Sequence, residues 1–261
     1  MTRYPINGTT LNIQIDLVGE HAPWLVMSNS LVTDLSIWQQ MLPAFQGWNL
    51  LRYDQRGHGE SDAPSGAVDF DLLSEDLLAV MDMAGASRAV CMGLSMGVPT
   101  TLAAYEKAPE RFRALVLMDG LARAAATAKE TWGARIAEAR EGGMSGYAEI
   151  TAKRWLTTPE TDPGTAEGLR AMIAGTSFAG FEACATALQT YDYAHVLPTL
   201  SLPVLLVAGL CDGAIGKTMQ EIADDIGAQF QGIPEAGHVP CFERPETAGP
   251  VVATFLKGVA R

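Results

Sequence analysis

The chain has 261 residues, of which 48% are hydrophobic and 18% charged, an ordinary balance for one large domain or a domain with an inserted lobe. Its formal net charge of −12 argues against nucleic acids and anionic membranes as partners, because both need basic surfaces. The four cysteines, Cys91, Cys184, Cys211 and Cys241, lack metal-binding spacing and predict buried free thiols in a reducing compartment. No apolar leader and no run of 18 apolar residues occurs, so we expect a cytoplasmic chain.

The first fifty residues carry mainly strand patterns. Period-two alternation over 3–6 and 10–18 predicts an antiparallel hairpin at a sheet edge. Residues 24–28 form a short apolar run without alternation, which is typical of a strand buried on both faces of a parallel sheet. Helical spacing over 35–45 predicts a helix, and residues 49–53 predict a further strand.

Strand and helix patterns then alternate with short connections. The pattern predicts a helix over 70–83 that ends at Gly85, a strand over 89–92, a helix over 96–108 and a strand over 114–118. Such alternation is typical of right-handed β-α-β crossovers, so we expect an α/β fold with a mostly parallel sheet and helices on both faces.

The pattern changes after residue 120. Residues 121–198 are Ala-rich, poor in strand patterns and interrupted by glycines, which predicts several short helices inserted between two core strands. We therefore expect a core formed by 1–120 and 199–261, with 121–198 as a helical cap. The core resumes with strands over 203–208 and 229–233 and helices near 217–225 and 245–257.

A Gly-x-Ser-x-Gly motif follows the strand over 89–92. A serine on a sharp strand-to-helix turn is exposed for attack, and glycines on either side remove Cβ atoms that would collide there. The N-terminus of the following helix favours an oxyanion formed at the serine. The motif predicts Ser95 as a nucleophile, the alternative being a glycine-rich turn with an idle serine.

A serine nucleophile needs a base and a group that orients the base. His238 lies after the last strand and before the last helix, at the sheet edge where open α/β sheets place their sites, and is the predicted base. His58 lies in a glycine-rich loop that it is expected to hold through hydrogen bonds. His21 and His195 are expected to be solvent-exposed or packing residues.

The orienting acid and the oxyanion donors follow from position in the chain. The order serine, acid, histidine favours Asp212, which follows a core strand, and Asp119, at the end of the preceding strand, is the second candidate. A buried carboxylate would fix the imidazole tautomer and stabilise the imidazolium. The backbone N–H groups of Leu31 and Met96 are the predicted oxyanion hole.

Several other side chains fit either a substrate pocket or an ordinary role as turn former, core residue or solvated charge. They are Asn29, Ser30, Trp132, Trp155, Tyr191, Arg123, Arg135 and Arg154.

With these motifs, the whole chain resembles an α/β-hydrolase and, more narrowly, the 3-oxoadipate enol-lactonase group. The narrower resemblance lies in Ser28-Asn-Ser-Leu31, Thr33-Asp-Leu35 with Trp38, Leu51-Arg-Tyr-Asp-Gln-Arg-Gly-His-Gly59, Gly93-Leu-Ser-Met-Gly97 and Phe178-Ala-Gly-Phe-Glu-Ala-Cys-Ala-Thr-Ala-Leu188. Family members usually carry Gly where this chain has Val32 and Val98, a difference that would narrow the pocket or shift the substrate.

The resemblance implies an α/β-hydrolase fold with an inserted helical cap, and a serine hydrolase without cofactor or metal. It would cleave a small ester or lactone through Ser95, His238, Asp212 and an acyl-enzyme, most like 3-oxoadipate enol-lactone hydrolysis in aromatic-compound degradation. The alternatives are a carboxylesterase, an amide or carbamate hydrolase, a C–C bond hydrolase and, from another class, a non-catalytic ligand-binding protein. The expected partner is the small-molecule substrate, and the acidic surface permits a homodimer.

Overall fold

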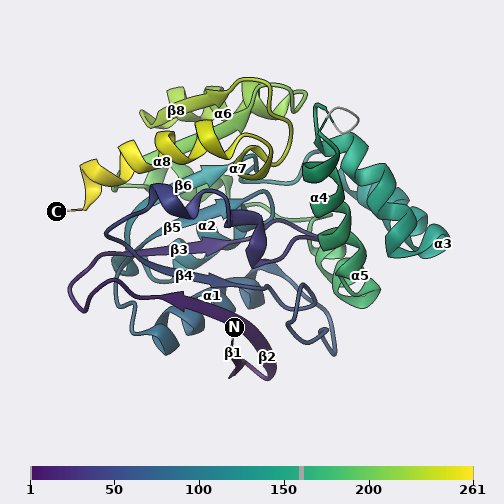
Figure 1. Ribbon diagram of the computed structural model, residues 1–261, viewed down its shortest axis with the longest axis horizontal. Coiled ribbons are helices and arrows are strands. Elements are labelled where there is room, and N and C mark those ends of the chain that lie inside the picture. Colours follow the sequence, from purple (N-terminus) through teal and green to yellow (C-terminus); the bar gives the residue numbers. More distant parts are fainter. Residues whose placement is uncertain (1, 159–161, 261) are drawn as a thin grey trace.

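The computed structural model describes residues 2–158 and 162–260, in which the strands form one eight-stranded sheet (Figure 1). The strands are β1 (Thr2–Ile6), β2 (Thr9–Asp16), β3 (Trp24–Ser28), β4 (Asn49–Tyr53), β5 (Ala89–Leu94), β6 (Phe112–Met118), β7 (Val204–Gly209) and β8 (Gln229–Ile233). Their order is β1-β2-β4-β3-β5-β6-β7-β8. The pairs β1/β2 and β2/β4 are antiparallel and the others parallel, which confirms the predicted edge hairpin and mostly parallel sheet.

Helices cover both faces of this sheet, as predicted. The helices are α1 (Phe70–Ala84), α2 (Gly97–Lys107), α3 (Ala128–Trp155), α4 (Pro163–Gly175), α5 (Phe178–Ala187), α6 (Ile215–Ile226), α7 (Pro240–Glu243) and α8 (Pro245–Val259). Alternate residues of a strand point to opposite faces. In β5, Val90 and Met92 pack in the cluster that contains the apolar side of α8, whereas Ala89 and Cys91 pack with α2 and α6 on the other face.

The helix predicted over 35–45 is wrong. The chain forms two short 3₁₀ turns there, Leu35–Trp38 and Leu42–Ala44. Pro43 lacks the N–H that an α-helix would pair with the carbonyl four residues earlier, and its ring collides with that turn. The short helix α7, which begins two residues after His238, was not predicted. The prediction of buried cysteines holds for Cys91, Cys184 and Cys241 but is wrong for Cys211, which is exposed in the loop after β7.

Between β6 and β7 the chain forms α3, α4 and α5, which stand together at the right of the sheet in Figure 1. Helix α3 spans 28 residues and is interrupted at Gly143, whose φ of 69° and ψ of 169° are not helical. Glycine adopts this conformation without a Cβ penalty. The division of the chain into core and cap remains a prediction.

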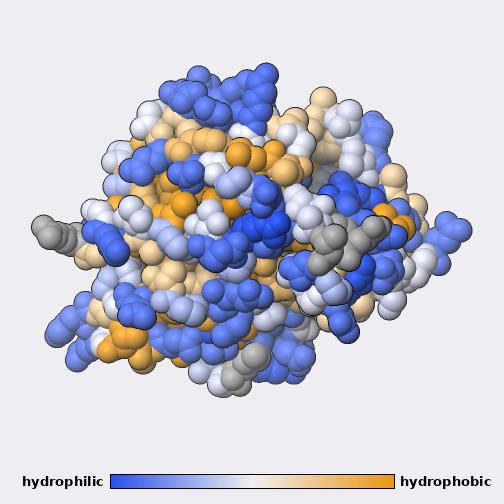
Figure 2. Space-filling view, turned by 45° about the horizontal axis from the view of Figure 1, so that its top comes forward, coloured by the Kyte–Doolittle hydropathy of each residue, from blue (hydrophilic) through white to orange (hydrophobic). Residues whose placement is uncertain are grey.

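The surface agrees with the acidic composition. Figure 2 shows hydrophilic side chains over much of the visible face, with hydrophobic ones in groups between them. Within the described ranges, no helix has the length and apolar character needed to cross a membrane.

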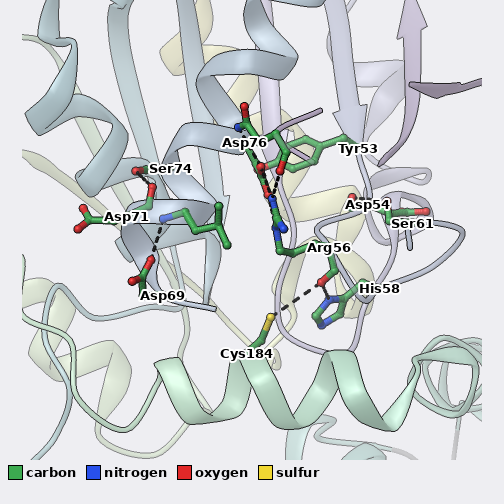
Figure 3. A network of polar contacts seen from close by, with 12 residues as sticks. Tyr53, Asp54, Arg56, His58, Ser61, Asp69, Asp71, Ser74, Asp76 and Cys184 are labelled. Carbon is green, nitrogen blue, oxygen red and sulfur yellow. Dashed lines mark hydrogen bonds and ion pairs between the residues drawn. The ribbon is translucent and has the colours of Figure 1, made fainter. Parts of the chain in front are cut away.

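A buried ion pair ties the loop after β4 to α1, and a hydrogen bond ties the same loop to α5 (Figure 3). The Nε of Arg56 lies 2.6 Å from Oδ2 of Asp76, and the two side chains are 7% and 2% exposed. The carbonyl oxygen of Arg56 accepts hydrogen bonds from Nδ1 of His58, at 3.1 Å, and from the Sγ of Cys184 in α5, at 3.9 Å. Burial lowers the pKa of His58 to about 4, so its ring is neutral and holds the loop, as predicted.

Replacement of Asp76 by Ala is expected to reduce the free energy of unfolding by about 3–5 kcal/mol, because it leaves the guanidinium of Arg56 buried without its partner. Urea unfolding measures this difference. In the control Asp71→Ala, the lost carboxylate is 72% exposed and pairs with Lys107, so we expect a loss below about 1 kcal/mol. Equal losses in the two variants would contradict this assignment.

Candidate active site

Ser95 occupies a tight turn between β5 and α2. Its φ is 52°, in the left-handed region that few residues other than glycine adopt, and its N–H donates to the carbonyl of Met118 at 2.8 Å. A Cβ on Gly93 would lie 2.2 Å from the carbonyl oxygen of Gly97. A Cβ on Gly97 would lie 2.2 Å from the carbonyl oxygen of Ser28. The strained serine thus depends on both glycines, which counts against an idle turn.

The structure brings Ser95, His238 and Asp212 together at the carboxyl ends of three strands. The Nε2 of His238 lies 2.9 Å from Oγ of Ser95, and its Nδ1 lies 2.7 Å from Oδ2 of Asp212. Of the acids that the sequence left open, Asp212 is therefore the one bonded to the imidazole. With Nδ1–H donating to Asp212, Nε2 is free to accept the proton of the serine hydroxyl.

Electrostatics keeps Asp212 in its anionic form. Burial by itself would raise the pKa of this carboxyl group. The hydrogen bond and charge of His238, together with Asp119 and Arg135, outweigh burial and lower the pKa below its ordinary value. An ionised Asp212 stabilises a proton on the neighbouring imidazole.

The loop that carries His238 is held by Glu243, a residue that the sequence reasoning missed. The Oε2 of Glu243 accepts from the N–H of Gly237 at 2.7 Å, and Oε1 accepts from the N–H of Thr157 at 2.6 Å. The N–H of His238 donates to the carbonyl of Trp155 at 2.9 Å. Glu243 is 5% exposed, although a charged residue before Arg-Pro looks like a surface position, so the sequence carries no signal for this role.

The N–H groups of Met96 and Leu31 remain the predicted oxyanion donors. Met96 directly follows Ser95 at the start of α2, and Leu31 lies in the turn after β3. Across residues 2–158 and 162–260, no acceptor is bonded to either N–H. The side chain of Asn29 is occupied elsewhere, since it donates to the carbonyl of Tyr53 and accepts from the indole of Trp38, so it is a structural residue.

A cavity of about 390 Å³ opens beside the three residues. It is lined by Ser95, Asp119, Gly120, Leu121, Ala124, Ala125, Thr127, Ala128, Thr131, Trp132, Arg135, Arg154, Trp155, Leu188, Tyr191, Asp212, Ala214, Ile215, Thr218 and His238. The size suits a small organic ligand.

This cavity resolves several alternatives that the sequence left open. Trp132, Trp155, Tyr191, Arg135 and Arg154 line it, whereas Arg123 does not. Helical spacing could not separate the aromatic residues among these from core residues, because a helix presents cavity-lining and core side chains with the same periodicity.

Val32 and Val98, the two valines at which the resemblance predicts a narrower pocket or another substrate, do not line the cavity. Val32 and Val98 are 0% and 1% exposed and belong to the hydrophobic core, so the narrowing predicted for the pocket is not found in this cavity. Val32 has a φ of 57°, in the left-handed region that favours glycine.

Two arginines give one side of the cavity positive charge. The guanidinium of Arg135 lies 4.6 Å from the ring centre of Trp132. Within the described ranges, Arg135 has no carboxylate in ion-pair contact, whereas Arg154 lies 3.5 Å from Glu138. Burial lowers the pKa of Arg135 but leaves it a cation near neutral pH.

Asp119, Asp212 and His238 form the cluster of candidate metal-binding side chains in the described ranges, with one ligand atom of each within 4.8 Å of the others. The Nδ1 of His238 and Oδ2 of Asp212 are already paired in a hydrogen bond. These atoms therefore serve the orientation of the imidazole.

Residues 23–245 match the alpha/beta hydrolase fold family. The chain belongs to this family. It is 33% identical over 239 residues to 3-oxoadipate enol-lactonase 2 of Acinetobacter baylyi, covering 90% of this chain and 89% of that relative. It is 30% identical over 261 residues to 3-oxoadipate enol-lactonase 1 of the same organism, covering 97% and 95%.

Solved structures agree with this membership. The enol-lactonase from Burkholderia xenovorans LB400 superposes with a TM-score of 0.91 at 33% identity, covering 98% of this chain and 100% of that one. A thermophilic esterase from Thermogutta terrifontis gives a TM-score of 0.92 at 26% identity, with full coverage of both chains. The family match and these relatives together show that the chain is a hydrolase.

Replacement of Glu243 by Ala is expected to lower kcat about 10- to 100-fold, because the buried N–H groups of Gly237 and Thr157 lose their acceptor and the His238 loop loosens. The control Glu246→Ala removes an exposed carboxylate from α8 and should leave kcat near the wild-type value. Steady-state kinetics measure kcat of each variant, and circular dichroism spectra that match the wild type show that the variants are folded. Full turnover by a folded Glu243→Ala protein would show that the loop does not need this anchor.

Proposed function

We propose that this hydrolase is a serine hydrolase of small lactones or esters, with Ser95 as nucleophile, His238 as general base and Asp212 as the orienting acid. The observation that carries the proposal is the continuous hydrogen-bond chain from Ser95 Oγ through His238 to Asp212, with contacts of 2.9 and 2.7 Å. This arrangement fits the roles of an activated alcohol nucleophile.

In the first half-reaction, Ser95 Oγ attacks the substrate carbonyl carbon while its proton passes to Nε2 of His238. The tetrahedral oxyanion would accept hydrogen bonds from the N–H groups of Met96 and Leu31. Its collapse breaks the bond to the leaving oxygen, which takes the proton from Nε2. In a lactone, the leaving oxygen stays attached to the acyl chain, so the ring opens as the acyl-enzyme forms.

In the second half-reaction, water loses a proton to Nε2 of His238 and attacks the acyl carbon. The bond to Ser95 Oγ breaks, and Oγ recovers the proton from Nε2. The carboxylic acid leaves, and the imidazole returns to its neutral form. Water is thus the co-reactant that is consumed, and the cycle requires no oxidant or reductant.

The cavity favours a substrate that carries a carboxylate. A lactone of an adipate uses one carboxyl group in the ring and leaves the other free, as in the compound for which the 33% identical relative is named. Arg135 lies in the cavity without an ion-pair partner in the described chain, stacked on Trp132. An arginine of this kind binds a carboxylate through two parallel hydrogen bonds. We therefore propose the 3-oxoadipate enol-lactone, or a lactone of similar charge, as substrate.

Ser95→Ala is expected to lose more than about 1,000-fold in kcat toward the enol-lactone, since no nucleophile replaces the hydroxyl. The assay follows acid release by wild type and variant with 3-oxoadipate enol-lactone, neutral lactones, short aryl esters, an amide and a carbamate. Preference for another compound would move the assignment to that acyl class. Full turnover by Ser95→Ala would overturn the serine mechanism, and a protein inert toward every compound would fit the ligand-binding alternative.

Arg135→Met keeps an unbranched side chain but removes the guanidinium group and its charge. We therefore expect kcat/KM for the anionic enol-lactone to fall about 10- to 100-fold, the loss of a charge-assisted hydrogen bond of about 1.5–3 kcal/mol. Neutral esters should lose much less. Arg140→Met is the matched control, because Arg140 also lies on α3 but pairs with Glu182 outside the cavity. Equal losses toward anionic and neutral substrates would contradict a carboxylate-binding role.

A further inference from the structure

Asp119 is a fully buried carboxyl group that the proposed mechanism leaves without a task. It directly follows β6, and its φ of 41° is left-handed. Its N–H donates to the carbonyl of Val207 at 2.9 Å, and its Oδ2 accepts from the N–H of Gly209 at 2.9 Å. The backbone and one oxygen of Asp119 are thus fixed against the end of β7, three residues before Asp212.

The other oxygen, Oδ1, is buried and has no donor bonded to it among the described residues. A buried polar atom without a partner is costly, and a buried carboxylate without a cation is more so. Asp212 and His238 lie beside the carboxyl group of Asp119, with one ligand atom of each of the three residues within 4.8 Å of the others. The carboxylate of Asp212 is a hydrogen-bond acceptor, so Oδ1 of Asp119 can bond to it only if Oδ1 carries a proton.

We propose that Asp119 is a positioning residue that stays protonated near neutral pH and donates a hydrogen bond from Oδ1 to the carboxylate of Asp212. This inference rests on the proposed roles of Asp212 and His238, which it deepens. Asp212 then receives hydrogen bonds from Asp119 on one side and from Nδ1–H of His238 on the other.

The electrostatics of the neighbouring groups supports this state. Burial, followed by the charge of Asp212, raises the pKa of Asp119 well above its ordinary value, and the hydrogen bond from Gly209 opposes this only in part. The thiol of Cys241 also faces Asp119, and burial raises its pKa, so it stays neutral and adds no charge. The charge of Arg135 lowers the pKa of Asp212.

A neutral Asp119 leaves the site with one negative charge beside the imidazole. That charge is matched when His238 takes the proton of Ser95. A second carboxylate would hold a proton on His238 before the reaction and so remove the free base. The buried acid thus keeps Asp212 charged and aligned without adding a second anion.

Infrared spectroscopy tests the protonation directly. The difference spectrum of wild type minus Asp119→Asn at neutral pH should contain the carbonyl stretch of a protonated carboxylic acid, shifted in D₂O. A difference spectrum that contains only carboxylate bands, and no band of a protonated acid, would overturn the proposal. This readout needs no turnover, so it stands even if the proposed substrate is wrong. Should the variant fail to fold, the band in wild type alone, and its loss at high pH, decides the question.

The pH profile of kcat/KM separates positioning from mere packing. Asp119→Ala removes the donor and should lower kcat about 10- to 100-fold, and Asp119→Asn, whose amide can still donate to Asp212 and accept from Gly209, should recover most of that loss. The acid limb should lie at the same pH in Asp119→Asn as in wild type. If Asp119 were ionised, removing its charge would lower that limb by about 1–3 pH units, and this shift would refute the proposal.

Discussion

The close approach of three backbone segments around Ser95 is the constraint on which the site depends. Strands β3 and β5 pair with Ser28 opposite Gly93, and α2 begins so close to them that neither Gly93 nor Gly97 has room for a Cβ. This crowding forces the left-handed φ of Ser95, and the parallel sheet supplies the rigid edge that resists it. The proposed nucleophile is therefore presented by the backbone, before any side chain contacts it.

The second requirement is a controlled charge balance at that edge. Loops after β5, β6, β7 and β8 place a hydroxyl, two carboxyl groups and an imidazole within one buried region. Such a cluster functions as a base only if its net charge stays low, which is why a single ionised acid beside His238 is the arrangement that we propose. The α3–α5 segment contributes the aromatic and cationic wall of the cavity, through Trp132 and Arg135. The strand ends would thus supply the chemistry and the helices the selectivity.

Local patterns in the sequence sufficed to predict most of the sheet and the residues that converge on it. The apolar run before Gly93 and the positions of Asp212 and His238 after strands carry their meaning within a few residues, and parallel topology then brings strand ends together. The helix predicted over 35–45 failed because Pro43 overrides helical spacing. Roles that depend on contacts between distant segments, such as Glu243 between Thr157 and Gly237, leave no local signal.

The cavity wall shows the same limit. Trp132 and Arg135 occupy helical positions that look like core and solvent, and only the folded chain places them in one cavity with Ser95 and His238. Val32 was expected to narrow the pocket, but its side chain is buried in the hydrophobic core. The residues of the cavity wall are therefore harder to predict from local sequence than the strands and helices of the fold.

The most direct test of the central claim is the rate at which a fluorophosphonate labels the protein, with the modified residue identified by mass spectrometry. If His238 activates Ser95, wild type should be labelled at Ser95 alone, and His238→Gln should be labelled at the same residue but at least about 100-fold more slowly. Labelling of another residue, or equal rates in the two proteins, would contradict the account.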